Sequence, residues 1–161
     1  MMYGLLPFLL LIFIMGFTAF EGDWARSTAG GTRQEISVTA QSQMFMAYRD
    51  AVLSYLETKP NLTGSGTIPT SALTLPPGVV AADLPASISN YVVVSGGTYT
   101  AYVYEAAVPG IIAAFNQEFP GDESIGIVTG STWTSAAGGV SSTLPIPLTN
   151  GDTISVFQIG D

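Results

Sequence analysis

The stretch QEISVTAQSQMFMAYRDAVLSYLETKP, Gln34–Pro60, decides the fold because it carries a helical repeat of apolar residues. The apolar side chains that recur at three- and four-residue steps include Phe45, Tyr48, Val52 and Tyr55. Lys59 lies at the end of the pattern, where a positive charge complements the helix dipole, and Pro60 stops the helix. We therefore expect a helix over Gln34–Thr58 with one apolar stripe that packs on a sheet.

After this helix the sequence predicts a loop-rich segment and then a hairpin. Gly and Pro interrupt Asn61–Ala86, so this segment is expected to hold little regular structure. SNYVVV (Ser89–Val94) and TYTAYVY (Thr98–Tyr104) are β-branched and aromatic runs joined by the tripeptide SGG, which predicts an antiparallel hairpin. Strand alternation places one set of side chains on a common face: Tyr99, Ala101 and Val103.

The remaining chain predicts a short helix and more strands. Pro109–Phe119 begins with a Pro in its first turn and carries apolar residues on one side, as a short helix would. Further strands are expected at Ser124–Thr129, at Ser131–Thr134 around Trp133 and at Thr153–Ile159. The predicted fold class is α+β, with a helix packed on an antiparallel sheet, which is a pilin-like architecture.

On the N-terminal side, Tyr3–Phe20 is an apolar run without a charged residue. As a helix with a rise of ~1.5 Å per residue it would reach about 27 Å, close to the roughly 30 Å of a bilayer core. A signal peptide is the alternative, but the chain start has no Lys or Arg, and a cut after Ala19 would put bulky Phe17 where small side chains are preferred. We expect residues 1–20 to be a retained membrane anchor, residues 21–33 a linker and residues 34–161 a single domain.

The motif GFTAFE, Gly16–Glu21, is similar to the processing site of type IV prepilins. In those proteins the apolar helix follows the cleaved Gly, whereas here the apolar run precedes it. The motif therefore does not predict a processed pilin.

The charge pattern excludes two classes of partner. Lys59 is the last basic residue, and every charged residue after it is acidic. The formal net charge of the chain is -8. Such a surface repels the phosphates of nucleic acids and anionic lipid headgroups, so neither is expected as a partner. The low content of charged residues, 10%, with 18 Gly and 10 Pro is typical of a β-rich extracytoplasmic domain.

The chain contains few residues of the types that catalyse reactions in enzymes. Cys and His are absent, which excludes thiol nucleophiles, Ser-His catalysis and ordinary zinc sites. The candidate pair of catalytic carboxylates is Asp122-Glu123. Adjacent residues in a turn point apart, and this pair follows Pro120-Gly121, so we expect exposed turn acids. The sequence predicts no enzyme, no catalytic or metal-binding residue and no cofactor.

The helical stretch MFMAYRDAVLSYLETKP, Met44–Pro60, placed after an anchor and a short linker, resembles the PilM family of type IVb pilus systems on conjugative plasmids. The similarity continues through Ala101–Tyr104 and the helix start at Pro109-Gly110, and it covers most of the chain. The resemblance implies a small inner-membrane protein of the thin-pilus assembly apparatus, with a single membrane pass, a periplasmic domain and no catalytic residues.

On this resemblance we expect a membrane-anchored structural component that helps to assemble a type IV pilus by contacting other assembly proteins or pilin subunits. A sheet edge or an aromatic surface would bind these partners. The candidate contact residues are Trp24, Tyr102, Tyr104 and Trp133, with core packing as the alternative for each. Two other hypotheses stay open, namely a minor pilin that enters the filament and a secreted binding module that loses Tyr3–Phe20. Self-association of several copies also stays open.

Overall fold

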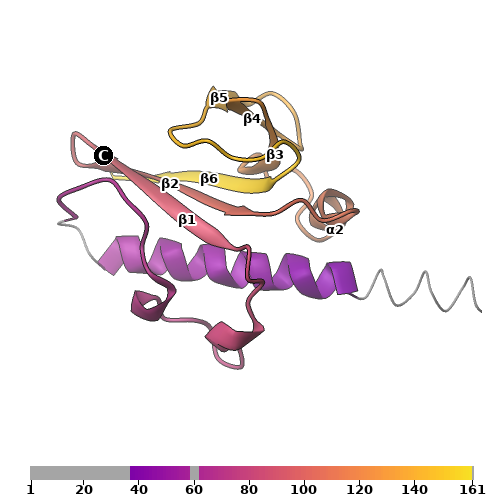
Figure 1. Ribbon diagram of the computed structural model, residues 1–161, viewed down its shortest axis with the longest axis horizontal. Coiled ribbons are helices and arrows are strands. Elements are labelled where there is room, and N and C mark those ends of the chain that lie inside the picture. Colours follow the sequence, from indigo (N-terminus) through magenta and orange to yellow (C-terminus); the bar gives the residue numbers. More distant parts are fainter. Residues whose placement is uncertain (1–36, 59–61, 161) are drawn as a thin grey trace, which may run out of the picture. The chain divides into compact units, whose positions relative to one another are not determined.

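The computed structural model describes residues 37–58 and 62–160 (Figure 1). The predicted anchor Tyr3–Phe20, the predicted linker over residues 21–33 and Trp24 lie outside these residues. Within the two described ranges, no helix is both long enough and apolar enough to cross a membrane. The folded domain is the unit Val38–Asp161.

The long helix covers residues 37–58 and lies along one face of the sheet (Figure 1). The predicted stripe is confirmed, because Phe45, Tyr48 and Val52 are at most 1% exposed and Tyr55 is half-buried against the same core. Burial of each large apolar side chain contributes roughly 1.5–3 kcal/mol. The helix is therefore held mainly by packing rather than by its own propensity.

In the described part of the chain, six antiparallel strands form one sheet in the order β1-β2-β6-β3-β4-β5. The strand bounds are β1 Ser89–Ser95, β2 Thr98–Glu105, β3 Ile125–Thr129, β4 Thr132–Ser135, β5 Ser141–Thr143 and β6 Thr153–Ile159. The predicted hairpin is confirmed as β1 and β2. Its turn residues Gly96 and Gly97 have φ of 60° and 89°, the left-handed values that two-residue hairpin turns require.

β5 is the strand that the sequence analysis missed. Its residues are all exposed, so it lacks the alternation of buried and exposed side chains that marks a half-buried strand. The other strands lie where they were expected, with β3 and β4 each shifted or shortened by about one residue, as is usual for element ends.

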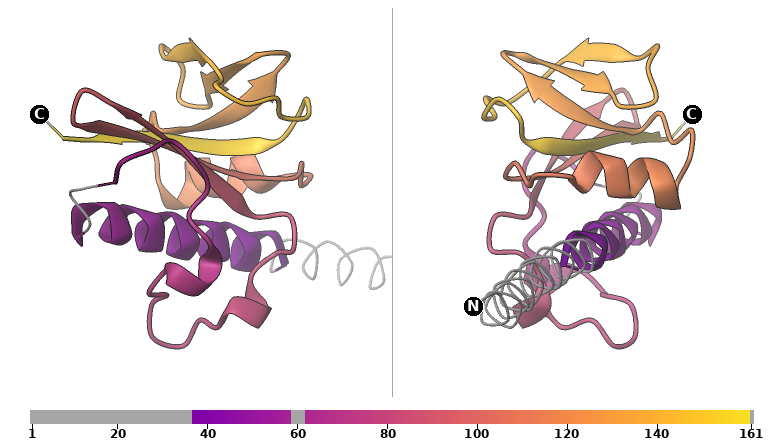
Figure 2. Two further views of the ribbon diagram at one scale, coloured as in Figure 1. Left: turned by 60° about the vertical axis from the view of Figure 1, so that its left-hand side comes forward. Right: turned by 90° about the vertical axis from the view of Figure 1, so that its right-hand side faces the viewer.

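The sheet buries apolar side chains on both faces. The residues that face the long helix include Val92, Tyr99, Ala101 and Val103. β3, β4 and β5 curl over the opposite face of β6 (Figures 1 and 2). The second hydrophobic cluster, enclosed by this curl, consists of Val128, Trp133, Leu144 and Ile154. The architecture is α+β, as predicted.

Gly126 in β3 allows the close approach on which the curl depends. A Cβ atom at this position would lie 2.1 Å from the Thr134 carbonyl oxygen and 2.9 Å from the Trp133 ring. Backbone cannot move aside as a flexible side chain can, so a larger residue would push β4 away. The glycine therefore gives Trp133 its place in the second cluster.

α2, Ile111–Glu118, lies on the same side of the sheet as the long helix (Figure 2). The rings of Phe115 and Phe45 meet edge to face with their centroids 5.3 Å apart. α2 confirms the predicted short helix, although it begins later than Pro109 because Gly110, with φ of 86°, breaks the helical path.

The segment before β1 covers the outer edge of that strand. Its described part, residues 62–88, contains two short 3-10 helices, Thr70–Ala72 and Ala81–Asp83. The Gly66 N–H donates to the Val92 carbonyl at 2.9 Å, and the Val92 N–H donates to the Gly66 carbonyl at 2.8 Å. The backbone groups of β1 that would otherwise face solvent are thus partly satisfied within the domain.

Candidate interaction surface

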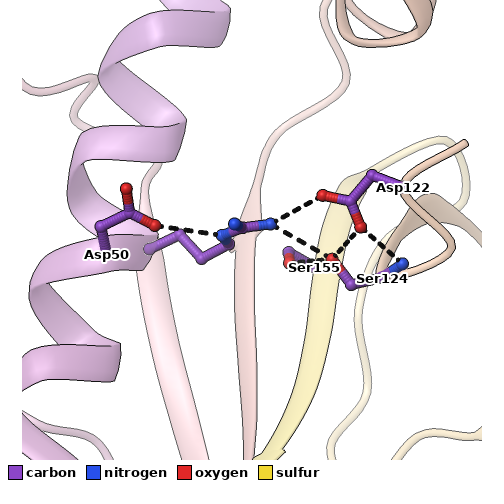
Figure 3. A network of polar contacts seen from close by, with 5 residues as sticks. Asp50, Asp122, Ser124 and Ser155 are labelled. Atoms are coloured by element: carbon purple, nitrogen blue, oxygen red, sulfur yellow. Dashed lines mark hydrogen bonds and ion pairs between the residues drawn. The ribbon is translucent and has the colours of Figure 1, made fainter. Parts of the chain in front are cut away.

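Polar side chains tie the long helix to its neighbours, and Arg49 is the centre of one such network (Figure 3). Its Nη1 lies 2.9 Å from Asp122 Oδ2 and 3.2 Å from the Ser124 hydroxyl, while its Nε lies 3.4 Å from Asp50 Oδ1. The Ser124 hydroxyl is also 3.3 Å from Ser155 Oγ on β6. The network joins the helix to the loop after α2 and to the sheet.

The same network favours the charged form of Asp122. Its second oxygen accepts hydrogen bonds from the Ser124 backbone N–H at 2.9 Å and from the Ser124 hydroxyl at 2.6 Å. Burial alone raises the pKa of this carboxyl, but the hydrogen bonds from Ser124 and Arg49 outweigh burial and lower the pKa below its ordinary value. Asp122 therefore stays ionised and paired with Arg49 at neutral pH.

The prediction that Asp122 and Glu123 are both exposed turn acids is wrong for Asp122. Glu123 is exposed, whereas the Asp122 side chain is only 26% exposed and pairs with Arg49. The partner comes from the long helix, far away in the sequence, so local turn chemistry did not reveal it. Glu123 takes no part in the hydrogen bonds and ion pairs of this network.

Glu105, at the end of β2, is 0% exposed and was missed as a candidate. Its Oε1 accepts a hydrogen bond from the Gln41 side-chain amide, while Oε2 has no hydrogen-bond partner among the described residues. Burial raises the pKa of this carboxyl, and the hydrogen bond from Gln41 opposes that only in part. Strand alternation could have found it, since Glu105 continues the series of buried residues Tyr99, Ala101 and Val103.

Two further contacts position elements around the long helix. The Asn90 side-chain amide donates to the Tyr48 hydroxyl at 2.7 Å and to the Ile68 carbonyl at 2.8 Å, and its oxygen accepts from the Ile68 N–H at 2.8 Å. The Glu118 carboxylate on α2 lies 2.9 Å from the Ser42 hydroxyl. These groups serve packing, and in the described ranges no group of three or more His, Cys, Asp or Glu could hold a metal ion.

Three of the four predicted contact residues lie at one cluster. Trp133 is 3% exposed within the second cluster, and its indole N–H donates to the Ser142 hydroxyl at 2.8 Å. Tyr102 and Tyr104 are half-buried against this cluster, and burial raises the pKa of Tyr102. Trp24 lies outside the described residues. Of the predicted set, only the two tyrosines offer a partner a substantial aromatic surface in the part of the chain that the structure describes.

Tyr91 extends this aromatic surface and was not predicted. It pairs directly with Tyr102 in the β1–β2 register, and Val93 pairs with Thr100 two residues along. Alternation places these side chains on the face opposite the long helix, and all four are half-buried. We call Tyr91, Val93, Thr100 and Tyr102 the tyrosine face. The cross-strand register of the predicted hairpin would have identified it.

The sheet edges differ in how open they are. The edge of β1 is covered by Gly66 and its neighbours, whereas β5 ends the sheet order and pairs only with β4 among the described strands. The stretch that contains β3, β4 and β5, Ser124–Gly151, has no charged residue. The edge strand β5, which is less covered than β1, thus lies in the uncharged stretch of an otherwise acidic domain.

Comparison with known proteins gives one family and one fold. A model of the PilM family matches residues 10–156 of the chain. The crystal structure of a protein named PilM from Escherichia coli B7A is similar, with a TM-score of 0.55 and 20% identity over 77% of this chain and 94% of that chain. At this identity the likeness concerns the fold alone. No curated protein matches the chain.

Proposed function

The chain belongs to the PilM family, and on this premise we propose that it is a membrane-anchored structural component of a type IV pilus apparatus that acts through protein contacts. Family membership implies involvement in pilus biogenesis. The observation that carries the proposal is the extent of the match, residues 10–156, which includes much of the apolar N-terminal run as well as the folded domain.

The proposed anchor is Tyr3–Phe20. Its support is the sequence, because the run carries no charge and is long enough to span a bilayer with little to spare. Trp24 follows it at the place where aromatic side chains favour the membrane interface. The folded domain would then lie in the periplasm of a single-pass inner-membrane protein.

The proposed contact surface is the tyrosine face together with Tyr104. Tyrosine supplies a large apolar contact area and a hydroxyl for hydrogen bonding, which is why it is enriched at protein interfaces. The face carries no charge, so docking there requires no buried ion pair. The partners we propose are other pilus assembly proteins or pilin subunits.

Site-specific photo-crosslinking tests this surface. A photoreactive phenylalanine at Tyr91 is expected to capture a pilus protein, identified by mass spectrometry, in cells that assemble pili. The matched control is the same group at Ser54, which is exposed on the long helix. Capture from Ser54 but not from Tyr91 would refute the tyrosine face as the contact surface.

Cell fractionation with protease protection tests the anchor and the side of the membrane. We expect the chain in the inner-membrane fraction, resistant to carbonate extraction, and its domain digested by protease added to spheroplasts. A soluble chain, or a domain protected until the spheroplasts are lysed, would contradict the proposed topology.

A minor pilin is the second candidate, favoured by the pilin-like packing of a long helix on an antiparallel sheet (Figure 1). In that case the protein enters the filament instead of remaining in the membrane. Mass spectrometry of sheared, washed pili separates the two, because a filament subunit is present in a fixed ratio to the major pilin and an assembly component is not.

A further inference from the structure

A fully buried carboxyl group lies beneath the first described turns of the long helix. Glu105 is 0% exposed, and Gln41 donates to one of its oxygens while the other has no partner within residues 37–58 and 62–160. An ionised carboxylate presents two acceptor oxygens that each require donors, so leaving one of them buried and unpaired is costly. A neutral carboxyl avoids most of this cost.

Among the residues that the structure describes, no positive charge compensates Glu105. Arg49, the one arginine in the described ranges, is engaged with Asp122 and Asp50. From β6, the register partner of Glu105 is Thr153, which is uncharged and buried. Three titratable groups on or next to the long helix, α2 and β6 have other partners: Tyr48 contacts Asn90, Glu118 contacts Ser42, and Asp152, just before β6, contacts Thr149.

We propose that Glu105 is a protonation switch for the long helix: its neutral carboxyl lets the first turns dock on the sheet, and its ionisation loosens that end. The inference does not depend on the proposed anchor or on any pilus partner. Loosening is confined to the turns before Phe45, because the apolar stripe from Phe45 onward is held by the core.

The direction of the effect follows from linkage. The pKa of Glu105 is higher in the folded domain than the ordinary 4.5, so its contribution to stability is complete below the unfolded pKa and is lost as the pH rises through the folded pKa. One proton released on unfolding changes the folded-to-unfolded ratio by up to about tenfold per pH unit in that interval.

Urea unfolding of the purified full-length chain from about pH 4 to about pH 8 tests the switch. The wild-type folded-to-unfolded ratio is expected to fall by up to about tenfold per pH unit between the unfolded and the folded pKa of Glu105, and to level off above the folded pKa. Glu105→Gln, which imitates the neutral carboxyl, is expected to remove this dependence. Glu123→Gln removes the same formal charge from an exposed site and is expected to keep it. A Glu105→Gln variant with the wild-type dependence would overturn the proposal.

Hydrogen exchange on the wild-type chain gives a second test that needs no variant. After correction for the intrinsic exchange rate, protection of residues 38–44 is expected to fall as the pH rises and to stay below the protection of residues 48–56, because the first turns open without global unfolding. Protection of residues 38–44 that does not change with pH, or equal protection of the two segments at every pH, would refute the local switch even if Glu105→Gln failed to fold.

Discussion

Asp122 and Glu105 are two carboxyl groups that contact the same helix and respond to burial in opposite ways. Asp122 accepts hydrogen bonds on both oxygens, from Arg49 and Ser124, and its pKa is lowered. Glu105 accepts one hydrogen bond, from Gln41, and its pKa is raised. Burial opposes ionisation at both sites, so the number and charge of the donors decide which form the fold prefers.

The two groups therefore make the stability of the domain depend on pH in opposite directions. The contribution of Asp122 is present above its unfolded pKa and is lost as the pH falls through its folded pKa. The contribution of Glu105 is lost as the pH rises. Between these limits the contacts at Arg49 and at Gln41 are both intact, and we expect the domain to be most stable there.

The largest effect on stability is expected from an uncharged residue, Phe45 of the apolar stripe. Phe45 lies between Gln41 and Arg49 in the helix and is 0% exposed. Phe45→Ala is expected to lower the free energy of unfolding by about 3–5 kcal/mol, because it leaves a cavity against Phe115. Chemical denaturation at acidic and neutral pH should give the same loss, and a loss that changes strongly with pH would show that apolar and ionic contacts are not separable here.

A smaller effect is expected when Asp122 loses its cationic donor. Arg49→Met keeps much of the apolar stem and is expected to cost about 2 kcal/mol at neutral pH, since a hydrogen bond to a charged group is lost. This loss of stability should shrink as the pH falls, because Asp122 then becomes protonated in the wild type and in the variant. Denaturation midpoints across the acidic range measure this.

A double-mutant cycle with Asp122→Asn is the matched control for Arg49. The two substitutions together should cost clearly less than the sum of the single losses, because each removes the same contact. Strict additivity would show that the ion pair contributes nothing to stability.

The smallest effect is expected next to Asp122. Glu123→Gln should change the free energy of unfolding by less than about 0.5 kcal/mol, because the side chain is exposed and lies outside the network of Figure 3. Denaturation at neutral pH measures it. A loss comparable to that of Arg49→Met would mean that local charge, rather than the specific pairing of Asp122, stabilises this loop.

The elements with a strong local period could be predicted from the sequence. The stripe of Phe45, Tyr48 and Val52 repeats over several turns, and the β1–β2 hairpin has a glycine turn between two β-branched runs. β5 could not be predicted, because its exposed residues carry no alternation and its pairing depends on the curl that Gly126 permits.

The polar contacts were harder to predict because they join distant parts of the chain. Arg49 and Asp122 are 73 residues apart, and nothing in either local sequence selects the other as a partner. Glu105 is different, since its place in the alternation of β2 was visible, but a charged residue at that position is usually assumed to turn toward solvent.

The proposed function requires that the domain be held at the membrane to support pilus assembly. The most direct measurement counts surface pili in a strain that lacks the gene and carries either the full chain or a form in which a cleavable signal peptide replaces residues 1–20. We predict that the full chain restores pili and that the exported, untethered domain does not. Equal restoration by both forms, or normal pili in the strain without the gene, would contradict the claim.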